Sequence, residues 1–492
     1  MNRKLIIRTL GTILLIEAAC MFPSLILAVV HVEDSWSALL ISILICASAG
    51  LPMRFLVEPQ SSNLRAREGF LIVALSWLLL ALFGALPFML SGFIPNFFDA
   101  VFESVSGFTT TGATVLTKGQ YMDAGGCMPY GIGFWRAFTH WIGGMGVLVL
   151  SLALLPKLTG RSAHLVRAES PGPSLSKIAP KMTDTAKILY IIYTALTVSE
   201  FVILMLCGMP AYDAALHAVS NAGTGGFSNR STSVAYYNNP SVDIVITVFM
   251  TLFSINMALY YAVATGRWRD FAKNEELRWF LCMLVGSGLL ITLLTLPVYT
   301  GNISEAMRHS FFNVATVMST TGFTIDGFTT SYWPVSAHGI ILCLMFCGAC
   351  VGSTAGGIKT MRIALLVKQS KREVGRTFYP RRVQRVRFDG RGIDETMLHQ
   401  VSVFCFVYVA LVLGGTLLIS LESSDSRFDL ISNFTASLTC VSNIGPCFGT
   451  AANGFSEYGS FSKVVMSILM LAGRLELFPI LAVFHRGAWR KV

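Results

Sequence analysis

Four segments of this chain interrupt long apolar stretches with backbone that is rich in glycine and threonine. Each segment places a Ser or Thr six residues before a Gly, at 106–112, 220–226, 316–322 and 439–445. Such backbone cannot face lipid at membrane depth, because its polar groups would lack hydrogen-bond partners, so it must line a wet path. Four such loops can close a ring of carbonyl oxygens, and a ring of this kind can replace the hydration shell of a potassium ion.

The rest of the chain is too apolar for a soluble protein. Of its 492 residues, 53% are apolar and 13% are charged, and the mean hydropathy is +0.63. Stretches long enough to cross a bilayer, roughly 20 residues each, are predicted at 10–31, 37–57, 70–91, 131–155, 188–209, 241–264, 279–298, 337–367, 399–421 and 463–485. An even number of spans places both termini on the same side of the membrane.

Lys and Arg cluster in alternate connections between these stretches. With the spans counted as above, the clusters all fall on one face, namely the N-terminus, 54–67, 157–187, 267–278, 362–391 and the C-terminus. The positive-inside rule makes that face cytoplasmic, so the glycine-bearing loops enter from the other side. The formal net charge of +10 therefore reflects membrane topology, and we expect no nucleic-acid partner. The run at 362–391 is expected to meet membrane lipid headgroups or to dock an acidic partner.

After an initial pair of spans, the order span, short helix, loop, span recurs four times. We expect an N-terminal helix pair at 1–60, followed by pore units at 61–156, 157–266, 267–392 and 393–492. The short helices, predicted at 96–106, 212–220, 304–316 and 427–439, cannot span and must be re-entrant. Their C-terminal ends, each carrying roughly half a negative charge, would converge and favour a cation. The predicted fold class is an all-α polytopic membrane protein with four pseudo-symmetric units around a central pore.

The residues directly before the loop glycines are the predicted ion ligands. The backbone carbonyls expected to coordinate the ion are those of Thr110, Thr111, Thr224, Gly225, Thr320, Thr321, Asn443 and Ile444. The filter glycines, which would supply unusual φ values or close approach, are Gly112, Gly226, Gly322 and Gly445. One such loop could equally reflect helix packing, but four in register favour a filter. The second loop reads Gly-Thr-Gly-Gly and the fourth Asn-Ile-Gly-Pro, so the ring is imperfect.

The stretch at 337–367 carries a second glycine-rich break in mid-membrane. Its polar and glycine residues are Gly348, Gly352, Ser353, Thr354, Gly356 and Gly357. Non-helical backbone at this depth is tolerated only against protein or water, and the alternative is a packing kink. Lys359 and Arg362, which follow the break, are predicted to be interfacial anchors.

Arg474 lies within the last span, where an ionised group is expensive and faces an aqueous cavity or a partner. Glu476 is two residues away, about 200° round a helix, so the two cannot simply neutralise each other. The alternative is an ion pair between Arg474 and an acid of another unit, such as Glu200.

Four motifs make the chain resemble the TrkH/KtrB/HKT superfamily. They are Ser-Gly-Phe-Thr-Thr-Thr-Gly-Ala at 106–113, His-Trp-Ile-Gly-Gly-Met-Gly-Val at 140–147, Gly-Ser-Thr-Ala-Gly-Gly-Ile-Lys at 352–359 and Gly-Arg-Leu-Glu-Leu-Phe at 473–478. The resemblance covers nearly the whole chain and implies potassium uptake through one pore. It also implies that the break at 348–357 is an intramembrane gate below the filter, and that Arg474 projects into the pore.

The same resemblance implies a homodimer in a bacterial inner membrane, with a cytoplasmic nucleotide-binding regulatory subunit resembling TrkA. Glycine in all four loops favours K+ as the transported ion, because Ser in the first loop is associated with sodium transport in plant relatives. A sodium or mixed Na+/K+ translocator stays the alternative, and the sequence does not distinguish a channel from H+- or Na+-coupled transport. No organic cofactor is expected in this chain.

An intramembrane enzyme or receptor is the alternative of a different class. Only scattered polar residues suggest it, among them Glu200, Asn256 and His140, and they lack the paired spacing that catalysis needs. The soluble segments contain no Walker A loop or metal-ligand cluster, which argues against ATP-driven pumping by this chain alone. Glu103, in the first re-entrant helix, is expected to be a packing or capping group.

Overall fold

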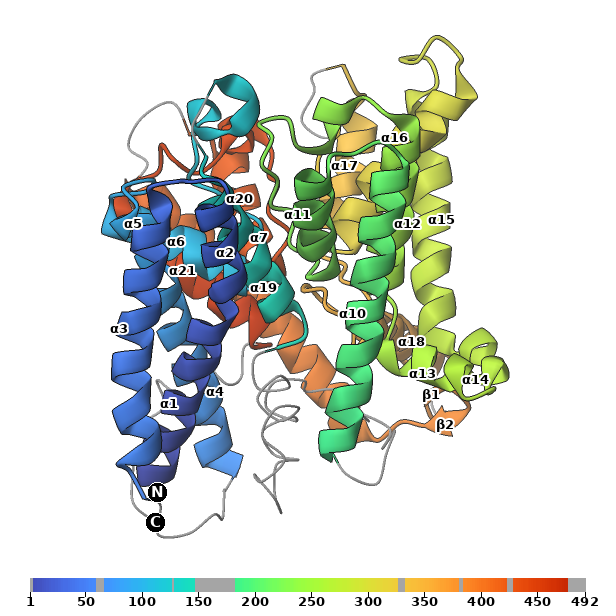
Figure 1. Cartoon of the computed structure of the whole chain (residues 1–492). Helices are drawn as coiled ribbons and strands as arrows, with labels where there is room; N and C mark the ends of the chain where they lie inside the picture. The colour runs from blue at the N-terminus through green and yellow to red at the C-terminus, as the bar shows by residue number, and fades with distance from the viewer. Residues whose placement is uncertain are drawn as a thin grey trace.

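The computed structural model is a bundle of α-helices with one short β-hairpin (Figure 1). It describes residues 3–58, 66–125, 128–146, 182–325, 332–379, 384–422 and 428–476. Six helices in this part of the chain are long and apolar enough to cross a membrane, namely Arg3–Val30, Ser35–Phe55, Glu68–Leu90, Thr185–Leu206, Glu275–Thr295 and Glu395–Glu422. The later parts of the spans predicted at 131–155 and 463–485 lie outside the described residues. The predicted all-α polytopic class is confirmed.

The N-terminal helices α1 (Arg3–Cys20), α2 (Phe22–Val30) and α3 (Ser35–Phe55) form a hairpin at one edge of the molecule (Figure 1). Helices α1 and α3 approach closely at two glycines. A Cβ built on Gly11 would lie 2.5 Å from the Cβ of Met53, and one built on Gly50 would lie 2.9 Å from the Gly11 carbonyl oxygen. Helix α1 also packs on α4, which attaches the hairpin to the first pore unit.

Four units follow, each with a short helix between longer ones. Unit 1 comprises α4 (Ala66–Gly84), α5 (Leu86–Leu90), α6 (Phe97–Phe108) and α7 (Tyr130–Gly144). Unit 2 comprises α10 (Met182–Leu206), α11 (Ala211–Ala222), α12 (Pro240–Phe253), α13 (Met257–Ala264) and α14 (Trp268–Lys273). Unit 3 comprises α15 (Glu275–Thr295), α16 (Ile303–Met318), α17 (Val335–Leu344), α18 (Thr360–Phe378) and the antiparallel strands β1 (Arg387–Phe388) and β2 (Arg391–Gly392). Unit 4 comprises α19 (Glu395–Glu422), α20 (Leu430–Ser442) and α21 (Ser460–Arg474). Single 3₁₀ turns occur at Lys118–Gln120, Met122–Ala124, Ser233–Tyr237 and Gly449–Asn453.

The short helices α6, α11, α16 and α20 lie within a few residues of the ranges predicted from sequence. Polar caps start three of them, because Asn96, Asn302 and Asp429 each accept a backbone N–H from the first turn. Hydrogen bonds from Ser432 lower the pKa of Asp429, which keeps this carboxylate ionised at the positive end of α20. The predicted start of the fourth helix, at 427, lies outside the described residues.

Helices of neighbouring units enclose the centre of the bundle. Helix α7 of unit 1 packs on α11 of unit 2, α12 of unit 2 packs on α16 of unit 3, and α21 of unit 4 packs on α6 of unit 1. Figure 1 shows α14 and the β-hairpin at the same end of the molecule as the start of α1. These basic segments therefore share one face, as their alternation along the chain predicts.

Two predicted spans are broken helices. The break expected in 337–367 is present, since α17 ends at Leu344 and α18 begins at Thr360. The stretch predicted as a span at 241–264 forms two helices, because α12 and α13 meet at an angle of 91°, a bend that the sequence did not predict. No Gly or Pro marks this second bend, and Asn256 stabilises it by accepting the first free N–H of α13.

Candidate ion path

The six-residue spacing from the Ser or Thr to the Gly of each loop results from the way in which each short helix ends. In every loop the residue before the glycine donates its N–H to the carbonyl of the Ser or Thr five residues earlier, Thr111 to Ser106 at 2.9 Å, Gly225 to Ser220 at 3.0 Å, Thr321 to Thr316 at 3.0 Å and Ile444 to Thr439 at 3.1 Å. This is the 6→1 hydrogen bond of a helix that terminates at a left-handed residue. The repeated spacing therefore comes from one local backbone geometry used four times.

The left-handed residue is a threonine in three loops. Its φ is 55° at Thr110, 56° at Thr224, 55° at Thr320 and 55° at Asn443. A β-branched residue rarely adopts this conformation, and strain of this kind concentrates at functional sites. The filter glycine two positions later also has a positive φ, from 76° at Gly112 to 99° at Gly445.

The four loops contact one another in a closed order. A Cβ atom built on each filter glycine would clash with a backbone carbonyl oxygen of the next loop. The distances from the built Cβ to that oxygen are 1.9 Å for Gly112 to Gly225, 2.1 Å for Gly226 to Thr321, 2.1 Å for Gly322 to Ile444 and 2.6 Å for Gly445 to Thr111. The fourth contact returns to the first loop, so the chain closes a ring. Asn443 also crosses this last junction, with its Nδ2 donating to Thr111 Oγ1 at 3.0 Å. The structure thus brings together the residues that were predicted as ion ligands.

A cavity of about 310 Å³ opens on the side where the chain leaves the loops, and all four filter glycines line it. Arg136 and Arg230 also reach this cavity, but each is held by an acid. Arg136 pairs with Glu103 at 2.5 Å, and Arg230 pairs with Asp213 at 2.7 Å. Glu103 further accepts the N–H of Val115 at 2.9 Å, which fixes the segment after the first loop. Glu103, expected to be a packing or capping group, is in the structure the ion-pair partner of Arg136.

The loop at 348–357 lies against the opposite side of the ring. Gly356 donates its N–H to Thr320 Oγ1 at 2.8 Å, which joins this loop directly to the third filter loop. The loop closes on itself, because Gly348 donates its N–H to the carbonyl of Ile358 at 2.8 Å. Backbone in this arrangement is surrounded by protein, as non-helical backbone at membrane depth requires.

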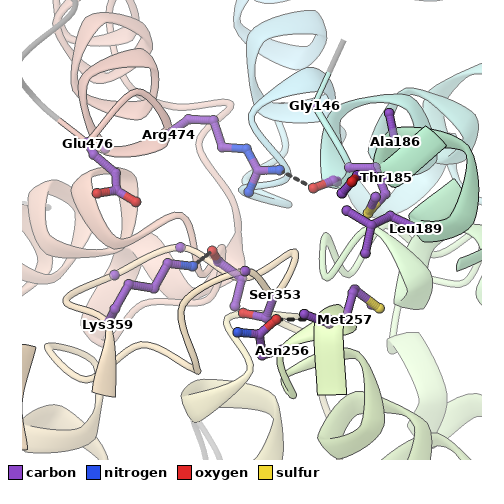
Figure 2. A pocket seen from close by; sticks show the side chains of 18 of the residues that line it. Gly146, Thr185, Ala186, Leu189, Asn256, Met257, Ser353, Lys359, Arg474 and Glu476 are labelled. Carbon is purple, nitrogen blue, oxygen red and sulfur yellow. Dashed lines mark hydrogen bonds between the residues drawn. The ribbon is translucent and has the colours of Figure 1, made fainter. Parts of the chain in front are cut away.

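A second cavity, of about 120 Å³, lies next to this loop, and Arg474 extends into it (Figure 2). The guanidinium donates to the carbonyl of Thr354 at 2.5 Å, to that of Gly144 at 2.6 Å and to that of Gly143. Arg474 of unit 4 therefore connects the loop of unit 3 to the C-terminal end of α7 in unit 1. That helix end carries negative partial charge, which stabilises the guanidinium.

The prediction that Lys359 and Arg362 are interfacial anchors was wrong. Lys359 is only 6% exposed, lines the second cavity and donates to the carbonyl of Ala355 (Figure 2). Arg362 pairs with Glu476 and lies 4.0 Å from the centre of the Phe404 ring. A basic residue at the end of an apolar stretch is usually an anchor, and only the fold of the loop brings these two inward.

The polar residues that suggested an enzyme or receptor lie apart and support the backbone. Glu200 accepts a hydrogen bond from Asn221 Nδ2 at 2.5 Å, at the end of α11. His140 Nδ1 contacts the carbonyl of Gly107 at 2.8 Å, and Asn256 caps α13. These contacts hold helix ends near the ring and assemble no catalytic group.

The family model for TrkH, a cation transport protein, matches residues 36–488. The chain belongs to the TrkH family. It is 34% identical to the Trk system potassium uptake protein TrkH of Salmonella typhimurium over 503 residues, which is 100% of both chains. It is 31% identical to the Trk system potassium uptake protein TrkG of Escherichia coli strain K12, covering 98% of this chain and 97% of that one. The crystal structure of the potassium transporter TrkH from Vibrio parahaemolyticus matches with a TM-score of 0.88 and 31% identity over 100% of both chains.

Membership of the TrkH family makes the chain a multi-pass membrane transport protein and excludes the enzyme or receptor alternative. Three of the four sequence motifs converge at Arg474. This residue belongs to the motif at 473–478, and its acceptors belong to the motifs at 140–147 and 352–359. The side chain of Arg474 therefore joins three motifs that lie far apart in the chain.

Proposed function

We propose that this TrkH-family chain carries K+ across the membrane through the ring of four loops. The observation that carries the proposal is the closed order of contacts between the filter glycines and the carbonyl oxygens of the next loop. The ion is coordinated by the carbonyls of Thr110, Thr111, Thr224, Gly225, Thr320, Thr321, Asn443 and Ile444. Four short helices end at the ring, and their negative ends favour a cation there.

Potassium is the preferred ion in this proposal, with sodium or mixed Na+/K+ transport as the second candidate. Glycine in all four loops supports potassium, and so do the names of the relatives, which are potassium uptake proteins. The contact of Gly445 with Thr111, at 2.6 Å from the built Cβ, is the longest of the four, and Gly445 belongs to the loop that has Asn443 where the other three have threonine. This departure from threonine is the feature that would admit sodium.

The loop at 348–357 and Arg474 form the gate in this proposal. Both line the second cavity, and they are hydrogen-bonded to each other. The gating residues are Gly348, Gly352, Ser353, Thr354, Gly356, Gly357 and Arg474. A positive charge beside the path repels the cation, so the charge must be displaced when the pore conducts.

The proposal places the chain in a bacterial inner membrane with both termini cytoplasmic, and as a homodimer with a nucleotide-binding subunit resembling TrkA. The word "system" in the names of the relatives supports a partner subunit. The basic segments gathered at one end of the molecule support a cytoplasmic face there (Figure 1). The units proposed are 61–156, 157–266, 267–392 and 393–492 after the N-terminal pair at 1–60.

Growth of a potassium-uptake-deficient bacterial strain on low potassium tests the proposal. The parent chain should restore growth, and Gly112→Ser should impair it and raise sodium permeability. Gly119→Ser is the matched control, because a Cβ there would meet nothing within 4 Å. A Gly112→Ser variant that supports growth like the parent, with unchanged sodium permeability, would contradict the filter assignment.

A further inference from the structure

Glu276, in the first turn of α15, contacts the gate loop and the first turn of α18, which follows that loop. Its Oε1 accepts the N–H of Val351 at 2.8 Å and the N–H of Met361 at 3.2 Å. The side chain is only 5% exposed. One buried side-chain oxygen thus satisfies two backbone N–H groups, which would be costly to leave without a partner.

The bend between α12 and α13 holds the same loop from unit 2. Cys350 donates its N–H to the carbonyl of Ser254 at 3.1 Å, and Met257 donates its N–H to the carbonyl of Gly352 at 3.1 Å. Asn256 also lies against the loop, since a Cβ built on Gly352 would be 2.8 Å from its Oδ1. Two broken helices of adjacent units therefore exchange backbone hydrogen bonds.

We propose that Glu276 is a positioning residue that latches the gate loop closed against the bend of unit 2. The inference rests on the gating role proposed above for the loop at 348–357. The loop cannot leave the ring while Glu276 holds Val351 and Met361. Without this latch the loop loses its hydrogen bonds to α15 and keeps those to unit 2, to Arg474 and to Thr320, so it opens more often. The filter loops do not contact Glu276 through these bonds, and the ion preference therefore stays the same.

The first test compares Glu276→Ala and Glu276→Gln in the full chain reconstituted into proteoliposomes. Glu276→Ala should raise basal potassium flux about tenfold, which corresponds to about 1.4 kcal/mol, at an unchanged ratio of potassium to sodium flux. Glu276→Gln keeps an acceptor oxygen at the same position and should stay near the parent. Glu275→Ala is the matched control, because Glu275 is the adjacent carboxylate and pairs with Lys368.

The second test measures whether the loop opens. The quantity measured is the rate at which N-ethylmaleimide labels single cysteines, mapped by peptide mass spectrometry. Cys350 lies in the loop and is 1% exposed, and Cys46 in α3 is 0% exposed and reports global unfolding. Glu276→Ala should label Cys350 about tenfold faster, with Cys46 at the parent rate, as expected of local opening. Cys350 labelling at the parent rate, or equal acceleration at both cysteines, would overturn the latch. Faster Cys350 labelling with unchanged flux would overturn the gating role on which the latch rests.

Discussion

Replacing Arg474 by alanine removes a positive charge from the place where units 1, 3 and 4 meet. Two unit charges repel by about 4 kcal/mol at 4 Å and by about 2 kcal/mol at 8 Å when the effective dielectric constant is 20. Each 1.4 kcal/mol is a factor of ten, so even the larger separation predicts a rise in potassium flux of about 30-fold. The variant should therefore conduct faster without its partner subunit.

Loss of the guanidinium also leaves three backbone carbonyls without this donor. The carbonyl of Gly144 belongs to a residue that lines a cavity of about 120 Å³, which has room for water to replace the lost donor. We therefore expect the variant to fold. The ion-pair alternative predicts instead that a stranded acid destabilises the protein by about 3–5 kcal/mol.

Potassium flux into proteoliposomes, together with thermal unfolding in detergent, separates the two outcomes. Arg474→Lys should remain nearer the parent, because the charge is kept. Arg376→Ala is the control for loss of one positive charge, since Arg376 is 56% exposed on α18. A folded Arg474→Ala protein that conducts no faster than the parent would refute the reasoning. A protein that unfolds would support the ion pair.

Three further predictions concern the ring, the gate loop and the ion pair beside the first filter loop. Gly112→Ala places a Cβ 1.9 Å from a backbone oxygen and should impair potassium uptake more than Gly445→Ala, at 2.6 Å, in a growth assay on low potassium; the reverse order would contradict the ring geometry. Gly348→Ala, with its Cβ 2.1 Å from a carbonyl of the same loop, should change open probability in single-channel records, and a change of ion selectivity alone would assign the loop to the filter. Glu103→Ala leaves Arg136 buried without its carboxylate and should cost about 3–5 kcal/mol of stability, seen as a lower unfolding temperature; an unchanged temperature would show that the pair contributes nothing.

The short helices and the filter glycines were predictable because a local rule produces them. When a helix ends at a left-handed residue, the number of residues between the Ser or Thr of its last turn and the following Gly is fixed. That number can be read from the sequence. The order in which Gly112, Gly226, Gly322 and Gly445 meet the next loop is not local. It follows from how helices of different units pack, which no spacing along the chain records.

Three features of the gate region escaped prediction for related reasons. The bend before Asn256 lies in an apolar run without Gly or Pro, so the run reads as one span. Glu276 stands beside Glu275 at the start of a helix, where acidic residues are common because they complement the dipole. Lys359 likewise looks like an anchor until the loop carries it inward. Tertiary contacts gave each of these residues a role that its local sequence does not distinguish.

The central claim is that the ring of loops binds the transported cation. Crystals grown in rubidium, with diffraction measured at the rubidium absorption edge, locate that ion directly. The account predicts anomalous peaks on the axis of the ring, at coordination distance from the carbonyl oxygens of Thr111, Gly225, Thr321 and Ile444. Peaks found only outside the ring, with none between these four oxygens, would contradict it.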